Sequence, residues 1–178
     1  MPDVKDILDS FESDESYYEE ITEVHIPKGT YPAHIIDLSV KCNVTTRQGN
    51  ICDLYHLTYR LAEPPYKGSE IRDTGVFRFK STLDPSKRRV RVGNFSYKQM
   101  LDKLNVPMEK VESNGDSTIF KLPSLTKDMV LGDPVIINVF KNEYHTKNGM
   151  RKENAARLVK SWVDGEPTED VGSDILDK

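Results

Sequence analysis

The sequence predicts a mainly β domain, a five-stranded Greek-key barrel with one helix between its third and fourth strands, and acidic arms at both ends. Three observations lead to this prediction. Stretches of alternating apolar and polar residues recur through the middle of the chain, turns containing Gly, Pro or Asn separate them, and one segment has the apolar spacing of a helix. A chain of 178 residues can bury one core but is short for two domains.

Charge is divided unevenly along the chain and sets the expected domain boundaries. Residues 1–23 hold nine acids and one base, and residues 164–178 hold six acids and one base, which leaves 23 bases and 14 acids in residues 24–163. We therefore expect an N-terminal arm (1–23) with a short amphipathic helix, a folded domain (24–163) and a disordered C-terminal tail (164–178). A basic body between acidic arms is typical of a protein that binds a polyanion.

The first three strands are predicted at residues 30–40, 51–61 and 70–80. The first is rich in β-branched residues, and the other two alternate between apolar side chains and polar or basic ones. Alternation of this kind indicates strands with one buried face and one solvated face. The aromatic residues assigned by it to the core are Tyr55, Tyr59, Phe77 and Phe79.

The second half of the domain is predicted to contain a helix and two further strands. Residues 96–104 have helical spacing until Pro107, and residues 133–145 form a strand that ends in a hairpin turn at Gly149. The periodicity of residues 152–163 fits a helix slightly better than a strand. We predict a strand there, because a hairpin turn directly after a strand requires a partner strand.

Three strands, a helix and two strands are the element order of an OB-fold, whose loops between strands 1 and 2 and between strands 4 and 5 flank a nucleic-acid groove. Those loops correspond here to "KCNVTTRQGN" and "NEYHTKNGMRKE". Together with "PKGTYPAHIIDLSV", "LYHLTYRL", "YKQMLDKLNV" and "VLGDPVIINVFKNEYHTKNGMRKENAARLVKSW", the chain from residue 26 to 163 resembles phage and viral single-stranded DNA-binding proteins of OB-fold type.

The resemblance implies sequence-tolerant binding of single strands in replication and recombination. It also implies an acidic C-terminal tail that recruits other replication proteins and competes with DNA for the groove. Known tails of this kind end on an aromatic residue, whereas this one ends "DILDK". The tail residues expected to bind partners are Asp170, Asp174, Ile175, Leu176 and Asp177.

Binding a single strand without reading its sequence requires cations along the backbone and aromatic faces on which bases stack. The predicted body contains both, in its strand faces and in its basic loops. The candidate binding residues are Arg47, Arg60, Tyr66, Arg72, Arg78, Lys80, Lys87, Arg88, Arg89, Arg91, Tyr144, Lys147, Arg151, Lys152 and Trp162.

The sequence lacks the phosphate-binding, dinucleotide-binding, zinc-protease and nucleophile-elbow motifs, so we predict a protein that is not an enzyme and has no cofactor. No metal site is expected, because Cys42 and Cys52 do not form a C-x-x-C pair. A membrane partner is not expected either, and we predict the cytoplasm, that of the host cell for a viral protein, since no apolar run of 18 residues and no signal peptide is found.

Two other hypotheses stay open at this point. The same barrel could serve as a protein-interaction module or virion component, with the basic surface against acidic proteins. A metal-dependent nuclease would use scattered acids such as Asp37, Asp53 and Asp73, which no fixed spacing pairs. A homodimer is also left open.

Overall fold

The structure is a computed structural model that describes residues 26–47, 49–82, 94–114, 117–147 and 149–171. Within these residues the protein is mainly β, as predicted, with two short helices. The elements are β1 (Gly29–Thr45), β2 (Asn50–Leu61), β3 (Glu70–Arg72), β4 (Val76–Thr82), α3 (Phe95–Lys103), β5 (Glu109–Asn114), β6 (Ser117–Lys121), α4 (Lys127–Val130), β7 (Pro134–Thr146) and β8 (Gly149–Ser161).

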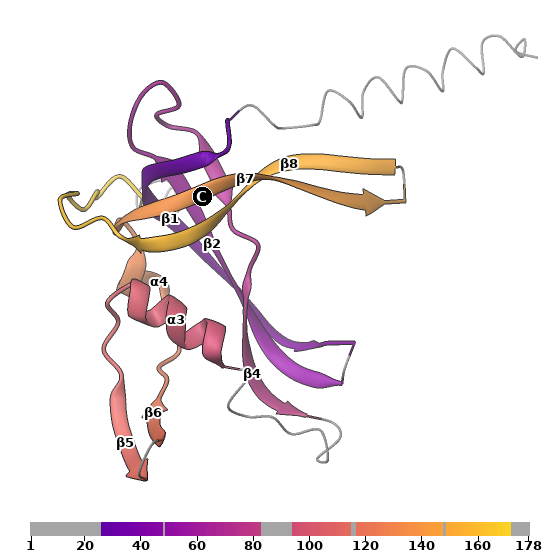
Figure 1. Ribbon diagram of the computed structural model, residues 1–178, viewed down its shortest axis with the longest axis vertical. Coiled ribbons are helices and arrows are strands. Elements are labelled where there is room, and N and C mark those ends of the chain that lie inside the picture. The colour runs from indigo at the N-terminus through magenta and orange to yellow at the C-terminus, as the bar shows by residue number, and fades with distance from the viewer. Residues whose placement is uncertain (1–25, 48, 83–93, 115–116, 148, 172–178) are drawn as a thin grey trace, which may run out of the picture.

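An antiparallel sheet of six strands forms the centre of the protein (Figure 1). Its strands follow the order β3, β2, β1, β7 and β8, and β4 pairs with the N-terminal part of β2. A parallel bridge between Asp73 and Ala156 joins the residue after β3 to β8, at the two ends of this order. The strands β5 and β6 form a separate hairpin.

The inner face of the sheet and α3 enclose one core. Leu57 and Tyr59 of β2 and Ile137 of β7 are fully buried, and they belong to the same cluster as Tyr97 and Leu101 of α3. Each side chain of this kind contributes about 1.5–3 kcal/mol by leaving water. The helix and the two Tyr residues of β2 therefore fit the sequence prediction.

The predicted strand at residues 70–80 is interrupted after Arg72. The Asp73 carboxylate accepts a hydrogen bond from the Gly75 N–H at 3.0 Å, and Gly75 has φ +92°. A Cβ atom at Gly75 would lie 2.7 Å from Cε1 of His56, so the turn requires glycine. This turn divides the predicted third strand into β3 and β4.

Between β4 and β7, the β5–β6 hairpin and α4 follow α3 and are absent from the predicted order of elements, although "STIFKL" indicated a possible short strand where β6 lies. The last segment is a strand, as predicted, since β8 pairs with β7 from Gly149 to Ser161. Neither helix in the described part of the chain is long and apolar enough to cross a membrane.

The folded part of the chain continues past residue 163, where the sequence placed the start of a disordered tail. The Thr168 N–H donates to the Gly132 carbonyl at 2.9 Å, Nε2 of His34 donates to the Glu166 carbonyl at 2.9 Å, and Val171 is buried. Gly132 has φ +87°, and a Cβ there would lie 2.1 Å from the Thr168 carbonyl oxygen. Residues 164–171 therefore pack against the body, and residues 172–178 lie outside the described residues.

Candidate functional site

A cleft of about 730 Å³ lies between the outer face of β2 and β3 and the β7–β8 hairpin. Alternation along β2 buries Leu57 and Tyr59 and turns His56 and Thr58 to the opposite face. The register pairs Thr58 with Arg72 of β3, so both side chains line the cleft. From the other side Tyr144 lines it, opposite Arg151 in the β7–β8 hairpin.

The Asp73 carboxylate contacts three residues at the base of the cleft. Its carboxylate lies 3.5 Å from Nδ1 of His56 and accepts a hydrogen bond from the Tyr59 hydroxyl at 3.3 Å, in addition to the one from Gly75. Burial raises the pKa of Asp73, partly offset by its hydrogen bonds and by His56. Burial, followed by the Asp73 charge, raises the pKa of Tyr59 well above its ordinary value. The Asp73 carboxylate therefore stabilises the fold through His56, Tyr59 and Gly75.

The side chains of Arg72 and Tyr144 line the cleft without a partner among the described residues. Arg72 is exposed and Tyr144 half-buried, and neither side chain forms a hydrogen bond or ion pair with any residue that the structure describes. The acids beside them are occupied, because Glu70 pairs with Arg60 at 3.1 Å and Glu153 lies 4.0 Å from the guanidinium of Arg151. Arg72 and the Tyr144 ring and hydroxyl are therefore available to a ligand.

Phe77 lies on the outer face beside the cleft, so its predicted place in the core is wrong. The register pairs Leu54 with Phe77 and Tyr55 with Val76, and Phe77 remains 44% exposed. The Asp73–Gly75 turn changes the phase of the alternation, so that even-numbered residues of β4 face inward and odd-numbered ones outward. Because Leu54 and His56 share one face of β2, Phe77 extends that face next to the cleft. The "DTG" turn signal was the sequence feature that could have revealed this change.

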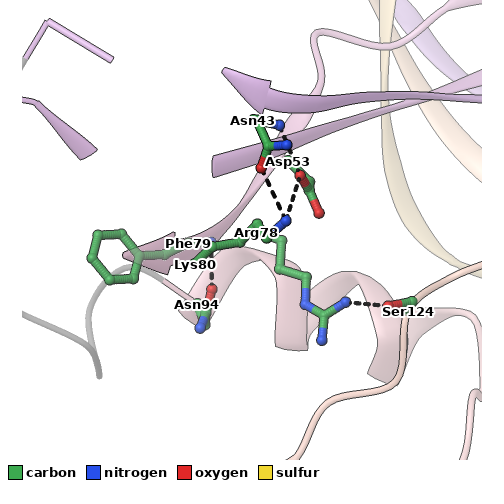
Figure 2. A network of polar contacts seen from close by, with 7 residues as sticks. All are labelled: Asn43, Asp53, Arg78, Phe79, Lys80, Asn94 and Ser124. Carbon is green, nitrogen blue, oxygen red and sulfur yellow. Dashed lines mark hydrogen bonds and ion pairs between the residues drawn. The ribbon is translucent and has the colours of Figure 1, made fainter. Parts of the chain in front are cut away.

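The same change of phase turns Arg78 inward, away from the predicted binding face. Its guanidinium lies 5.2 Å from the Tyr97 ring centroid and donates to the Leu122 carbonyl at 2.8 Å and to the Ser124 hydroxyl. Figure 2 shows Arg78 reaching from β4 to Ser124. Arg78 thus connects the sheet to the segment that precedes α4.

Lys80 is also engaged. Its ammonium lies 3.0 Å from Oδ1 of Asn43 and 3.6 Å from Oδ1 of Asp53, which also accepts the Asn43 N–H (Figure 2). Asn43 has φ 56° at an irregularity in the β1–β2 register. In the same region the Phe79 N–H donates to Oδ1 of Asn94 at 2.7 Å. These contacts connect β1, β2 and β4 at the ends of the strands near the β1–β2 turn.

The predicted aromatic contacts other than Tyr144 belong to the fold. Tyr66 packs against the core with its ring edge-on to Tyr31, 6.3 Å between centroids. Trp162 is half-buried, 6.0 Å from the His34 ring, and a Cβ at Gly165 would lie 2.4 Å from its ring atoms. Both rings are half-buried against other residues of the fold, and Trp162 also lines a separate pocket beside Pro134 and Gly165.

The remaining predicted cations are distributed around the hairpin ends. Arg47 is exposed at the β1–β2 turn, and Lys147 is exposed at the β7–β8 turn. Lys152 pairs across the hairpin with Glu143, whose pKa is lowered by Lys141 and to a smaller extent by Lys152. Asp170 of the predicted tail is exposed. The predicted residues outside the described part of the chain are Lys87, Arg88, Arg89, Arg91, Asp174, Ile175, Leu176 and Asp177.

No three His, Cys, Asp or Glu side chains in the described ranges lie close enough together to hold a metal ion. Cys42 is exposed and Cys52 is buried, and burial followed by the Asp53 charge raises the pKa of the Cys52 thiol. The comparisons add no relative, because no family model, no curated protein and no solved structure matches this chain.

Proposed function

We propose that this protein binds single-stranded DNA without sequence specificity and coats it during replication or recombination, in the cytoplasm of a phage-infected cell. Its fold would be an OB-type barrel, partly open, in which β3 and β4 together form the third strand. Five antiparallel pairings support this assignment: β1 with β2, β2 with β3, β2 with β4, β1 with β7, and β7 with β8. The parallel bridge from Asp73 to Ala156 would join the third strand to the fifth.

The observation that carries the proposal is that one cation and two aromatic rings lie on the same surface of the sheet, where a ligand can reach them. The side chains of Arg72 and Tyr144 line one cleft and have no partner among the described residues, and the exposed Phe77 extends the same face of the sheet. Arg72 would contact phosphates, while the two rings would stack with bases at about 1–3 kcal/mol each. The exposed Arg47 and Lys147 would add sequence-independent attraction for the backbone.

Binding of fluorescent oligonucleotides, followed by anisotropy over a salt series, tests this proposal. Single strands should bind more tightly than duplex, with a slope of log affinity against log salt of about −0.7 for each phosphate neutralised. Equal weak affinity for single strands, duplex and heparin would refute it and would favour the protein-interaction module. The oligonucleotides should remain intact with Mg²⁺ or Mn²⁺, since a nuclease would cleave them.

Phe77→Ala is the variant that distinguishes a stacking surface from a merely charged one. We expect single-strand affinity to fall about 5- to 100-fold, the equivalent of one stacked base, with little change in stability because the ring is 44% exposed. Phe95, 61% exposed at the start of α3 and not part of the cleft lining, provides the matched control. If Phe95→Ala weakened binding as much as Phe77→Ala, the β2–β4 face would not be the stacking surface.

A further inference from the structure

The β7–β8 hairpin places an aromatic ring and two polar side chains along one wall of the cleft. β1 pairs with β7 only as far as Val139, so the hairpin continues beyond the rest of the described sheet as a two-stranded arm (Figure 1). Asn142 and Tyr144 lie two residues apart on β7 and therefore share a face, and both are half-buried and line the cleft. The register places Glu153 of β8 directly opposite Asn142, and Glu153 lines the cleft as well. A ring, an amide and a carboxylate are thus neighbours on this wall.

The amide and the carboxylate of this wall can still form hydrogen bonds with a ligand. Glu153 forms an ion pair with Arg151, but Oε2 of Glu153 lies 4.0 Å from Nε of Arg151, which is longer than a hydrogen bond. Neither the Glu153 carboxylate nor the Asn142 amide has a hydrogen bond to any residue in the described ranges. Glu70 differs, since its carboxylate accepts a hydrogen bond from Arg60 at 3.1 Å. Asn142 therefore offers a donor beside the two acceptor oxygens of Glu153.

The charge of the cleft favours an uncharged base over a phosphate. Its lining carries the carboxylates of Glu70, Asp73 and Glu153 against the guanidinium of Arg72. A phosphate inside the cleft would lie among like charges, whereas a base would not. Arg72 is exposed, so it can contact a phosphate that stays outside. The volume of about 730 Å³ falls within the range of about 300–1,000 Å³ that is usual for sites of small ligands.

We infer that the cleft recognises a guanine base, which stacks on Tyr144 and is hydrogen-bonded by Asn142 and Glu153. The pairing edge of guanine presents the O6 acceptor followed by two donors, N1–H and the 2-amino group. The amide N–H of Asn142 and the two oxygens of Glu153 are complementary to it, a donor followed by two acceptors. Adenine, cytosine and thymine each present a donor at one position of this edge, so none of them engages both carboxylate oxygens.

The base preference adds to a binding mode that backbone charge and stacking otherwise determine. That the base reaches the cleft as part of a single strand rests on the proposed function, whereas the recognition of guanine does not. One guanine in a strand would therefore fix which nucleotide occupies the cleft.

The first test compares three oligothymidylates of about 12 nucleotides whose central base is guanine, hypoxanthine or thymine. In fluorescence anisotropy with the full chain, the guanine oligonucleotide should bind about 5- to 150-fold more tightly than the thymine one, the range for a bidentate contact to a base. Hypoxanthine lacks only the 2-amino donor, so its oligonucleotide should bind more weakly than the guanine one. Equal affinities for guanine and hypoxanthine would overturn the inference and leave the proposed function standing, because ring size alone would then explain any gain over thymine.

Glu153→Gln should bring the ratio of guanine to hypoxanthine affinity close to 1, because an amide offers one acceptor oxygen in place of two. Glu143→Gln is the matched control. Glu143 lies between Asn142 and Tyr144 on the same strand, so it faces away from the cleft, and its substitution removes the same charge. The control should keep the ratio of the unsubstituted protein. A ratio that fell equally in both variants would contradict the role of Glu153.

Titration with guanosine monophosphate, followed by amide NMR, separates recognition of the base from binding of the strand. We expect the signals of Asn142, Tyr144 and Glu153 to shift, while that of Lys121 on the separate β5–β6 hairpin does not. Cytidine monophosphate carries the same phosphate and should leave the cleft signals in place. Equal shifts with both nucleotides would refute the inference. Shifts with guanosine monophosphate alone, without binding of any oligonucleotide, would support guanine recognition and refute the proposed function.

Discussion

Arg72 and Arg78 lie six residues apart on what the sequence presents as one strand face, yet their removal should have different effects. Loss of Arg78 should lower the stability of the fold, whereas loss of Arg72 should weaken binding of single strands. Arg78→Ala deletes a charge-assisted hydrogen bond to the Leu122 carbonyl and the contact with the Tyr97 ring. The hydrogen bond contributes about 1.5 kcal/mol at this partly exposed site, and the cation–π contact about 0.5–1 kcal/mol. We therefore expect a loss of about 2 kcal/mol in the free energy of unfolding.

Urea unfolding monitored by tyrosine and tryptophan fluorescence measures this loss. With an m value of about 2 kcal/mol per molar, the midpoint of Arg78→Ala should fall by about 1 M urea at unchanged m. Arg72→Ala should leave the midpoint unchanged, weaken single-strand binding and reduce the salt slope by about 0.7, the value for one phosphate. The reasoning would be refuted if Arg78→Ala left the midpoint unchanged and weakened binding as much as Arg72→Ala.

Two further predictions concern the packed C-terminal segment and the floor of the cleft. Gly132→Ala should destabilise the protein by more than the roughly 1 kcal/mol expected for Gly68→Ala in thermal unfolding, because both have positive φ but only Gly132 has a backbone carbonyl 2.1 Å from the added Cβ. Equal losses would contradict the packing of Thr168 on Gly132. Asp73 has a raised pKa in the folded protein, so the folded state binds its proton more tightly, and its contribution to stability should fall as pH rises from about 4 through that raised value. Urea unfolding should show this decline relative to Asp73→Asn, and parallel pH curves for the two proteins would contradict it.

Much of the β framework could be predicted because its signals are local. Alternation of apolar and polar residues along 51–61 follows from the pleat alone, and the structure places Tyr55, Leu57 and Tyr59 inside as that pattern requires. The last strand was also predictable, since a turn at Gly149 directly after a strand requires a partner.

The binding surface could be predicted only in part, because it depends on the alignment of distant segments. The prediction that odd-numbered residues of 70–80 face the core is correct for Ile71 and wrong for Phe77. The turn at Asp73 and Gly75 lies between them, and the register of β4 with β2 then decides which face each residue of β4 takes. Of the predicted cations on this stretch, Arg78 and Lys80 bond to other residues of the fold, whereas the Arg72 side chain has no partner in the described part of the chain.

The sequence by itself determined that the chain forms a mainly β body, that the segments of β1, β2, β7 and β8 are strands, and that negative charge concentrates at both ends. Only the tertiary structure decided which cations are free and where each acidic end is attached. Arg78 is occupied by a carbonyl 44 residues away, and Ile26 is held at the cleft by Asn154, 128 residues away. Hydrogen bonds between such distant residues leave no periodic trace in the sequence, whereas the pleat of a strand leaves one at every second residue.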